Sequence, residues 1–252
     1  MKFFDTHSHY YDERFDEDRD DLLKKLLEEY NCGILTCASD LESADFLKEI
    51  SHRYENIWYA AGIHPHECLK YELSDLDKLF PYFEDEKCVA VGECGLDYYY
   101  DGDYRDRQIE FFRAQCDIAK QVKKPIIVHD REAHADTINV LSDLRPEAVI
   151  HCYSGSLESA KILVGLGCYI SFAGTLTFKN ASKLLSVAEW VPEDRILIET
   201  DAPYLAPEPM RGHRNDSSLV VHTAQKLADL RGCSLEHIAE VTANNAKKVF
   251  GI

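Results

Sequence analysis

The stretch PIIVHDR at residues 125–131 places a proline and three aliphatic residues directly before His129. A short apolar run rich in β-branched residues is typical of a strand that is buried on both faces, as in a parallel sheet. The stretch AVIH at residues 148–151 repeats the pattern and ends in His151. Because the carboxyl ends of parallel strands meet at one edge of a sheet, two neighbouring strands that end in histidine indicate a site at that edge.

The same kind of apolar run recurs through the whole chain. The runs cover residues 2–6, 33–38, 57–63, 88–92, 125–128, 148–150, 168–172 and 196–198. The segments between them are amphipathic: from residue 106 to 121, apolar side chains recur at spacings of three and four, which places them on one face of a helix. Eight strands that alternate with helices close a (β/α)₈ barrel, which needs about 250 residues. For this chain of 252 residues we therefore predict an α/β fold, a single (β/α)₈ TIM barrel domain over residues 1–252, with its site at the C-terminal ends of the strands.

Composition limits the partners and the compartment of the protein. The formal net charge of −17 argues against broad electrostatic adhesion to nucleic acid, although metal ions in an acidic site could still attract a phosphate. No apolar stretch approaches the roughly 18 residues that span a bilayer, and the charged N-terminus does not look like a signal peptide. The nine cysteines form no CxxC pair, which favours reduced, mostly buried thiols. We expect a cytoplasmic protein without a membrane partner, and its oligomeric state stays open.

Six residues of metal-binding type stand at or just after the ends of the apolar runs. They are His7, His9, Glu93, His129, His151 and Asp201. Taken singly, each has an ordinary interpretation, such as a surface histidine, a turn acid or a hydrogen-bonded core histidine. Imidazole and carboxylate groups are ligands of divalent cations, and six of them at the strand ends of one barrel indicate a two-metal site.

Three further acids have supporting or alternative roles in this interpretation. Asp5 is expected to be structural or to orient a ligand, and Asp97 is expected to orient the loop after the fourth strand. Asp201 could bind metal and also accept a proton from an attacking water. Glu199 is the competing candidate for that role, because it lies two residues earlier on the same face of the strand.

Four other residues are candidates for substrate contacts. His64 and His66 follow the third apolar run, and loop structure explains them equally well. Arg131 and Arg214 could neutralise the charge of a bound phosphate.

These residues lie in motifs that resemble those of the TatD-type metal-dependent deoxyribonucleases, a branch of the amidohydrolase-like barrels. The motifs are DTHSH, GIHPHE, GECGLDYYY, RQIEFFRAQ, PIIVHDRE, HCYSGS, ETDAPYLAP, RGHRNDSSLV and ANNAKKVFGI, so the resemblance covers nearly the whole chain. It implies one metal held by His7, His9 and Asp201, a second held by His129 and His151, and a bridge formed by Glu93. It also implies hydrolysis of DNA, commonly as a 3′-to-5′ exonuclease. One departure is Ser217, which follows Asp216 where the family usually has proline.

We therefore predict a metal-dependent hydrolase that cleaves DNA phosphodiester bonds with two divalent ions, Mg²⁺, Mn²⁺ or Zn²⁺. The nearest alternative is an esterase, lactonase or deacylase on the same barrel, including one that acts on an aminoacyl-tRNA ester. Such barrels often use a carbamylated lysine as the bridge, so Glu93 at this place favours the nuclease. A catalytically idle scaffold would lack ligands, whereas all six are present in this chain.

Overall fold

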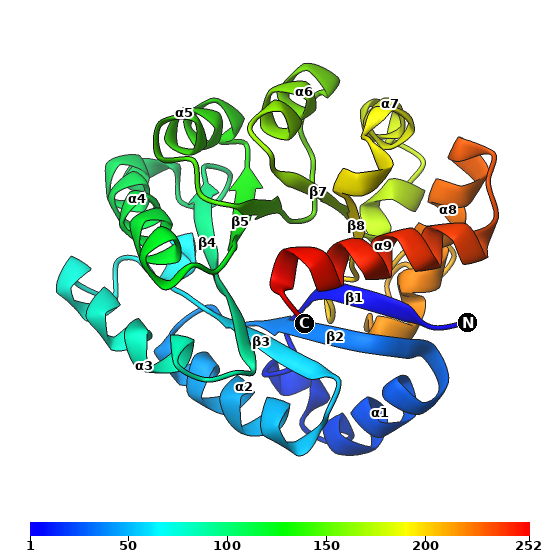
Figure 1. The fold of residues 1–252 in the computed structure, drawn as a ribbon, viewed down its shortest axis with the longest axis horizontal. Coiled ribbons are helices and arrows are strands. Elements are labelled where there is room, and N and C mark those ends of the chain that lie inside the picture. Colours follow the sequence, from blue (N-terminus) through cyan, green and yellow to red (C-terminus); the bar gives the residue numbers. More distant parts are fainter.

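Each of the eight apolar runs forms a strand, and the strands pair in parallel and in sequence order (Figure 1). A computed structural model describes residues 1–252. The strands are β1 Phe3–Ser8, β2 Asn31–Cys37, β3 Ile57–Ala61, β4 Cys88–Asp97, β5 Ile126–Arg131, β6 Ala148–Ile150, β7 Tyr169–Phe172 and β8 Ile196–Ile198. The helices are α1 Arg19–Lys25, α2 Leu41–Arg53, α3 Phe80–Phe83, α4 Arg105–Val122, α5 His134–Leu144, α6 Leu157–Gly165, α7 Ser182–Trp190, α8 Val220–Arg231 and α9 Leu235–Phe250. The predicted (β/α)₈ barrel is confirmed.

The seam between the first and last strands closes only at their carboxyl ends. β1 and β8 share no continuous ladder, and a single parallel bridge joins Ser8 to Ala202. The amide of Asp201 donates to the carbonyl of His7 at 3.0 Å, and the amide of His9 donates to the carbonyl of Ala202 at 2.6 Å. Residues that are candidate ligands therefore also close the barrel.

Strands β4 and β5 extend farther than the apolar runs predicted. β4 continues through Glu93 to Asp97, so Glu93 and His129 lie within paired strands and not after them. The pairing has an irregularity between Val91 and Cys94, and irregularities of this kind often re-aim a side chain near a site. Gly95 then lies opposite His129 with a φ of +138°, and a Cβ at Gly95 would lie 2.1 Å from the carbonyl oxygen of His129. The extension therefore depends on a residue without a side chain.

The outer layer follows the predicted amphipathic pattern. In α4, Phe112, Cys116 and Ala119 are buried against the strands, as the spacing between residues 106 and 121 predicted. All nine cysteines are free, and six of them are buried. The helices of the chain include none that is both long and apolar enough to cross a membrane.

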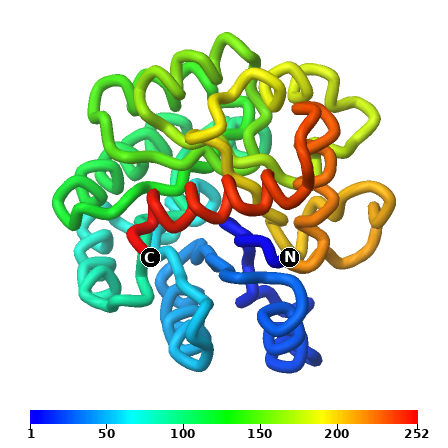
Figure 2. The backbone as a smooth tube through the Cα atoms, turned by 45° about the vertical axis from the view of Figure 1, so that its right-hand side comes forward, coloured from blue at the N-terminus to red at the C-terminus, as the bar shows by residue number.

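The last helix, α9, covers the end of the barrel where the strands begin. Ala243, Ala246, Val249 and Phe250 pack in one cluster with side chains from all eight strands, among them Phe4. Figures 1 and 2 show α9 crossing over the strands near both chain termini. Ser234 caps the helix by accepting from the amide of His237. On the same helix Ile238 is buried, whereas Leu235 and Val241 are only half-buried.

Candidate metal centre

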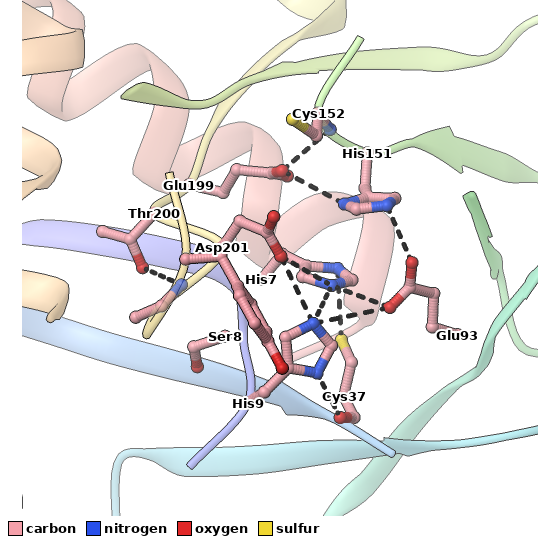
Figure 3. Close-up of polar contacts among 12 residues, drawn as sticks. His7, Ser8, His9, Cys37, Glu93, His151, Cys152, Glu199, Thr200 and Asp201 are labelled. Carbon is pink, nitrogen blue, oxygen red and sulfur yellow. Dashed lines mark hydrogen bonds and ion pairs between the residues drawn. The ribbon is translucent and has the colours of Figure 1, made fainter. Parts of the chain in front are cut away.

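All six candidate ligands converge at the carboxyl ends of the strands. His7 lies in β1 and His9 just after it, Glu93 in β4, His129 in β5, His151 directly after β6, and Asp201 after β8. Figure 3 shows how His7, His9, Glu93, His151 and Asp201 point toward one another at this end of the barrel. Their ligand atoms form overlapping groups, such as His7, His9 and Asp201, in which all atoms lie within 4.8 Å of one another.

Glu93 lies at the centre of the cluster, and its two oxygens face different histidines. Oε2 lies 3.2 Å from Nε2 of His7 and 3.5 Å from Nε2 of His9. Oε1 lies 2.8 Å from Nδ1 of His129 and 2.8 Å from Nε2 of His151. Each oxygen thus lies nearest to a different pair of imidazoles. A carboxylate needs this arrangement to bridge two cations.

The donor set fits a divalent cation. The Nε2 atoms of His7 and His9 lie 3.1 Å apart, and Oδ1 of Asp201 lies 3.3 Å from Nε2 of His9. Nitrogen ligands bonded at about 2.0–2.1 Å to one tetrahedral zinc ion lie about 3.4 Å apart, so these atoms have the spacing of ligands around one ion.

The other ring nitrogen of three of these histidines donates to a group outside the cluster. His9 donates through Nδ1 to the carbonyl of Cys37 at 3.0 Å, and His151 donates through Nδ1 to Glu199 at 3.2 Å. His129 donates through Nε2 to Oδ2 of Asp97 at 3.1 Å. Such bonds fix the tautomer and ring orientation of a metal-binding histidine, so the nitrogen that faces Glu93 is free to bind a cation.

Glu199, the competing candidate for the role of Asp201, contacts His151 from a fully buried position. The Glu199 side chain is fully buried, and its Oε1 also accepts from the amide of Cys152 at 2.7 Å. The Asp201 side chain is 13% exposed and contacts His9, so it faces both the cluster and the open end of the barrel. Its φ of +60° lies in the left-handed region, which aspartate tolerates better than most residues.

Asp97 has the predicted role and one more. Its Oδ1 accepts from the amides of Tyr99 and Tyr100 at 2.9 Å each, which orients the loop after β4. Its Oδ2 accepts from both His129 and His66. The second role could not be predicted, because nothing in the sequence places His129 beside Asp97.

Asp5 has a structural role, as expected. It is hydrogen-bonded to Ser217, the residue that departs from the family pattern. Its buried carboxylate accepts from the amide and hydroxyl of Thr200 at 2.9 and 2.6 Å. The hydroxyl of Ser217 donates to the same carboxylate at 2.5 Å, a bond that proline could not make. Asp5 thereby ties β1 to the residue that precedes Asp201.

Electrostatics favour a charged carboxylate at the centre of the site. Burial opposes ionisation of Glu93, but the nearby His151 and His7 outweigh it and hold the Glu93 pKa well below its usual value. Burial likewise opposes protonation of His151, but Glu93 and Glu199 raise the His151 pKa well above its usual value. For His9, Asp201 and Glu93 outweigh burial and raise the pKa. Without a cation, the neighbouring acids therefore favour protonation of His9 and His151.

The four candidate substrate contacts have different surroundings. Nε2 of His64 lies 3.5 Å from Glu93, and burial lowers the His64 pKa to about 4, so this imidazole is neutral near pH 7. His66 donates to Asp97. The Arg131 guanidinium lies over Tyr99, and Arg214 is paired with Asp18, which is not part of the cluster. The structure thus places His64 beside Glu93, one of the candidate ligands. Arg214 is instead paired with Asp18, away from the cluster.

Known proteins resemble this chain in both sequence and fold. The family model described as TatD related DNase matches residues 4–251. The metal-dependent hydrolase YabD of Bacillus subtilis (strain 168) is 39% identical over 252 residues, covering 99% of each chain. The 3′-5′ ssDNA/RNA exonuclease TatD of Citrobacter koseri is 31% identical over 247 residues, covering 95% of each chain. The crystal structure of YJJV, a TatD homologue from Escherichia coli K12, superposes with a TM-score of 0.93 at 30% identity, covering 99% of this chain and 98% of that one.

The barrel, its cluster of imidazoles and carboxylates, and these relatives define a metal-dependent hydrolase of the class that acts on phosphodiester or other ester bonds. Within this class, the chain belongs to the TatD-related DNase family.

Proposed function

We propose that this enzyme hydrolyses phosphodiester bonds of DNA, as a 3′-to-5′ exonuclease that acts on single strands or ends. The observation that carries the proposal is Glu93, whose two oxygens face the pair His7 and His9 and the pair His129 and His151. The relative from Citrobacter koseri, whose name describes a 3′-5′ exonuclease of single-stranded DNA and RNA, supports the choice of substrate.

In this proposal the six residues hold two divalent cations. His7, His9 and Asp201 would hold one, His129 and His151 the other, and Glu93 would bridge them. Bound divalent ions polarise phosphoryl oxygens and lower the pKa of a water molecule. Asp201 would orient the attacking water and accept its proton, since its lowered pKa keeps the carboxylate ionised and it is more exposed than Glu93. His64, which is neutral, can hydrogen-bond to the substrate but cannot neutralise a phosphate charge.

The test is cleavage of end-labelled single-stranded DNA by chelator-stripped protein, with Mg²⁺, Mn²⁺ or Zn²⁺ restored separately. We expect a metal-dependent ladder of products that shortens from the 3′ end. Glu93→Ala is the control: we expect it to lose turnover and metal, measured by elemental analysis, while circular dichroism shows a folded protein.

Two results would contradict the proposal. A ladder that persists in Glu93→Ala would remove Glu93 from the mechanism. Failure of folded, metal-loaded protein to cut DNA, together with hydrolysis of an ester such as an aminoacyl-tRNA, would favour the deacylase.

A further inference from the structure

Two large aromatic side chains are exposed in the loop after β4, beside the candidate metal centre. Tyr99 is 55% exposed and Tyr100 is 62% exposed, so burial in the core does not explain either ring. The backbone that carries them is nevertheless held in place, because the amides of both residues donate to Oδ1 of Asp97. The loop therefore presents two aromatic rings to solvent from a fixed backbone.

An arginine lies over both rings. The guanidinium carbon of Arg131 lies 4.4 Å from the ring centroid of Tyr99 and 4.7 Å from that of Tyr100. The two tyrosine rings meet edge to face with centroids 4.7 Å apart. Arg131 is itself exposed and has no carboxylate partner among the ion pairs of the structure. We call Tyr99, Tyr100 and Arg131 the tyrosine platform.

The platform is connected to the candidate ligands through His66. The ring of His66 meets the edge of Tyr100 at 5.5 Å between centroids, and it lies 6.3 Å from the ring of His129. Both histidines donate to Oδ2 of Asp97. One acid therefore positions a candidate metal ligand with one oxygen and the tyrosine loop with the other.

The chemistry of the platform suits a flat, neutral ring. Aromatic side chains and arginine planes stack on nucleobases, and such stacking does not depend on the base, because every base has a π-face. The negative charge of the protein disfavours long-range attraction of a phosphate chain, so contacts to the base gain importance. A base within a duplex is already stacked and paired, so only an unpaired base can lie on the platform.

We propose that the tyrosine platform is a stacking site for an unpaired nucleobase next to the phosphodiester that is cut. This inference rests on the proposed function, since it assumes a nucleic-acid substrate. It assigns Tyr99 and Tyr100 a binding role, and it gives Arg131 a contact with the base in addition to any contact with phosphate.

The test compares two substrates: a single-stranded oligodeoxynucleotide, and a strand of equal length that carries abasic residues. KM and kcat are measured for the wild type and for the double variant Tyr99→Ala/Tyr100→Ala, with the metal content and melting temperature of each protein as checks on the fold. Tyr99→Phe/Tyr100→Phe keeps the rings. Tyr30→Ala is a matched control, because Tyr30 is an exposed tyrosine that directly precedes β2, at the opposite end of the barrel.

We expect the wild type to have a lower KM for the strand with bases. The alanine double variant should raise that KM by about tenfold or more, with a smaller effect on kcat, so that the ratio of the two KM values approaches one. The phenylalanine variant and Tyr30→Ala should keep the ratio of the wild type.

Two results would overturn the inference, and they differ from each other. If the wild type cuts the oligonucleotide and the alanine variant keeps the same KM ratio, the platform is not a base site and the proposed function stands. If folded, metal-loaded wild type cuts neither strand, the proposed function fails and the platform fails with it.

Discussion

Asp201 differs from the other acids of the site in its surroundings. Glu93 and Glu199 are enclosed by histidines and backbone, whereas the Asp201 side chain keeps contact with the open end of the barrel. Contact with His9 and the other nearby imidazoles outweighs burial and lowers the Asp201 pKa. An ionised carboxylate with one side free is suited to accept a proton from a water molecule.

For Asp201→Asn we expect folded protein with turnover reduced about 100-fold or more, because an amide cannot accept that proton. The measurement is kcat on single-stranded DNA together with metal content. Glu199→Gln is the comparison: it keeps the shape of the buried acid but weakens its bond to His151, so we expect a loss of metal affinity. Normal turnover in Asp201→Asn would assign the base to another group.

The histidines predict how metal binding depends on pH. The pKa values of His9 and His151 are raised in the metal-free site, and a protonated imidazole has no lone pair for a cation. Lowering the pH therefore favours protons over metal, and raising it favours metal. We expect Zn²⁺ affinity to fall steeply from about pH 8 to about pH 6, with proton release on binding, as calorimetry in buffers of different ionisation enthalpy would show. Affinity that is constant over this range would contradict the raised pKa values.

At the scale of elements, the pairing of β4 with β5 positions both Glu93, the proposed bridging acid, and the imidazole of His129. β4 remains paired with β5 as far as Asp97 and Arg131, which places Glu93 and His129 on two adjoining strands and the tyrosine platform where this pairing ends. The close approach at Gly95 allows this pairing, because its backbone lies directly against the carbonyl of His129.

Gly95→Ala tests this contact. The new Cβ would lie 2.1 Å from the carbonyl oxygen of His129, and the φ of +138° is strained for alanine, so the two strands must separate. We expect a loss of about 1–3 kcal/mol in the free energy of unfolding and reduced metal content. Gly102→Ala is the control, because a Cβ at Gly102 would meet no atom within 4 Å beyond its chain neighbours. Equal effects of the two substitutions would argue against a special role for Gly95.

At the scale of the whole molecule, the two ends of the barrel are lined by different kinds of side chain. The carboxyl ends of the strands hold buried imidazoles and carboxylates that oppose one another in charge. The other end is filled by apolar side chains from all eight strands and is covered by α9. The apolar cluster beneath α9 and the candidate ligands therefore lie at opposite ends of the barrel.

Phe250→Ala should test that separation. Phe250 is 5% exposed in the cluster beneath α9, so we expect a loss of about 3–5 kcal/mol in the free energy of unfolding, measured by denaturant titration. Metal content and kcat of the folded protein should change little, since the site lies at the other end. Phe46→Ala, at a phenylalanine that is 37% exposed, should cost much less. A large loss of kcat in folded Phe250→Ala would show that the two ends of the barrel are coupled.

The sequence by itself determined the barrel and the set of candidate ligands. Eight apolar runs, with His7, His129 and His151 at their ends, were sufficient because a parallel strand buried on both faces is recorded in consecutive residues. The order of strands followed from the alternation with helices. Ligand type and strand end are both local properties, so they could be read without a structure.

Only the tertiary structure decided which side chains face one another. The bonds from His151 to Glu199, from His129 to Asp97 and from Ser217 to Asp5 each join residues at least 32 positions apart. Their formation depends on the twist and register of neighbouring strands, and small changes in register alter which atoms meet. The cover provided by α9 was missed for the same reason, because an amphipathic pattern shows that a helix has a partner but not which one.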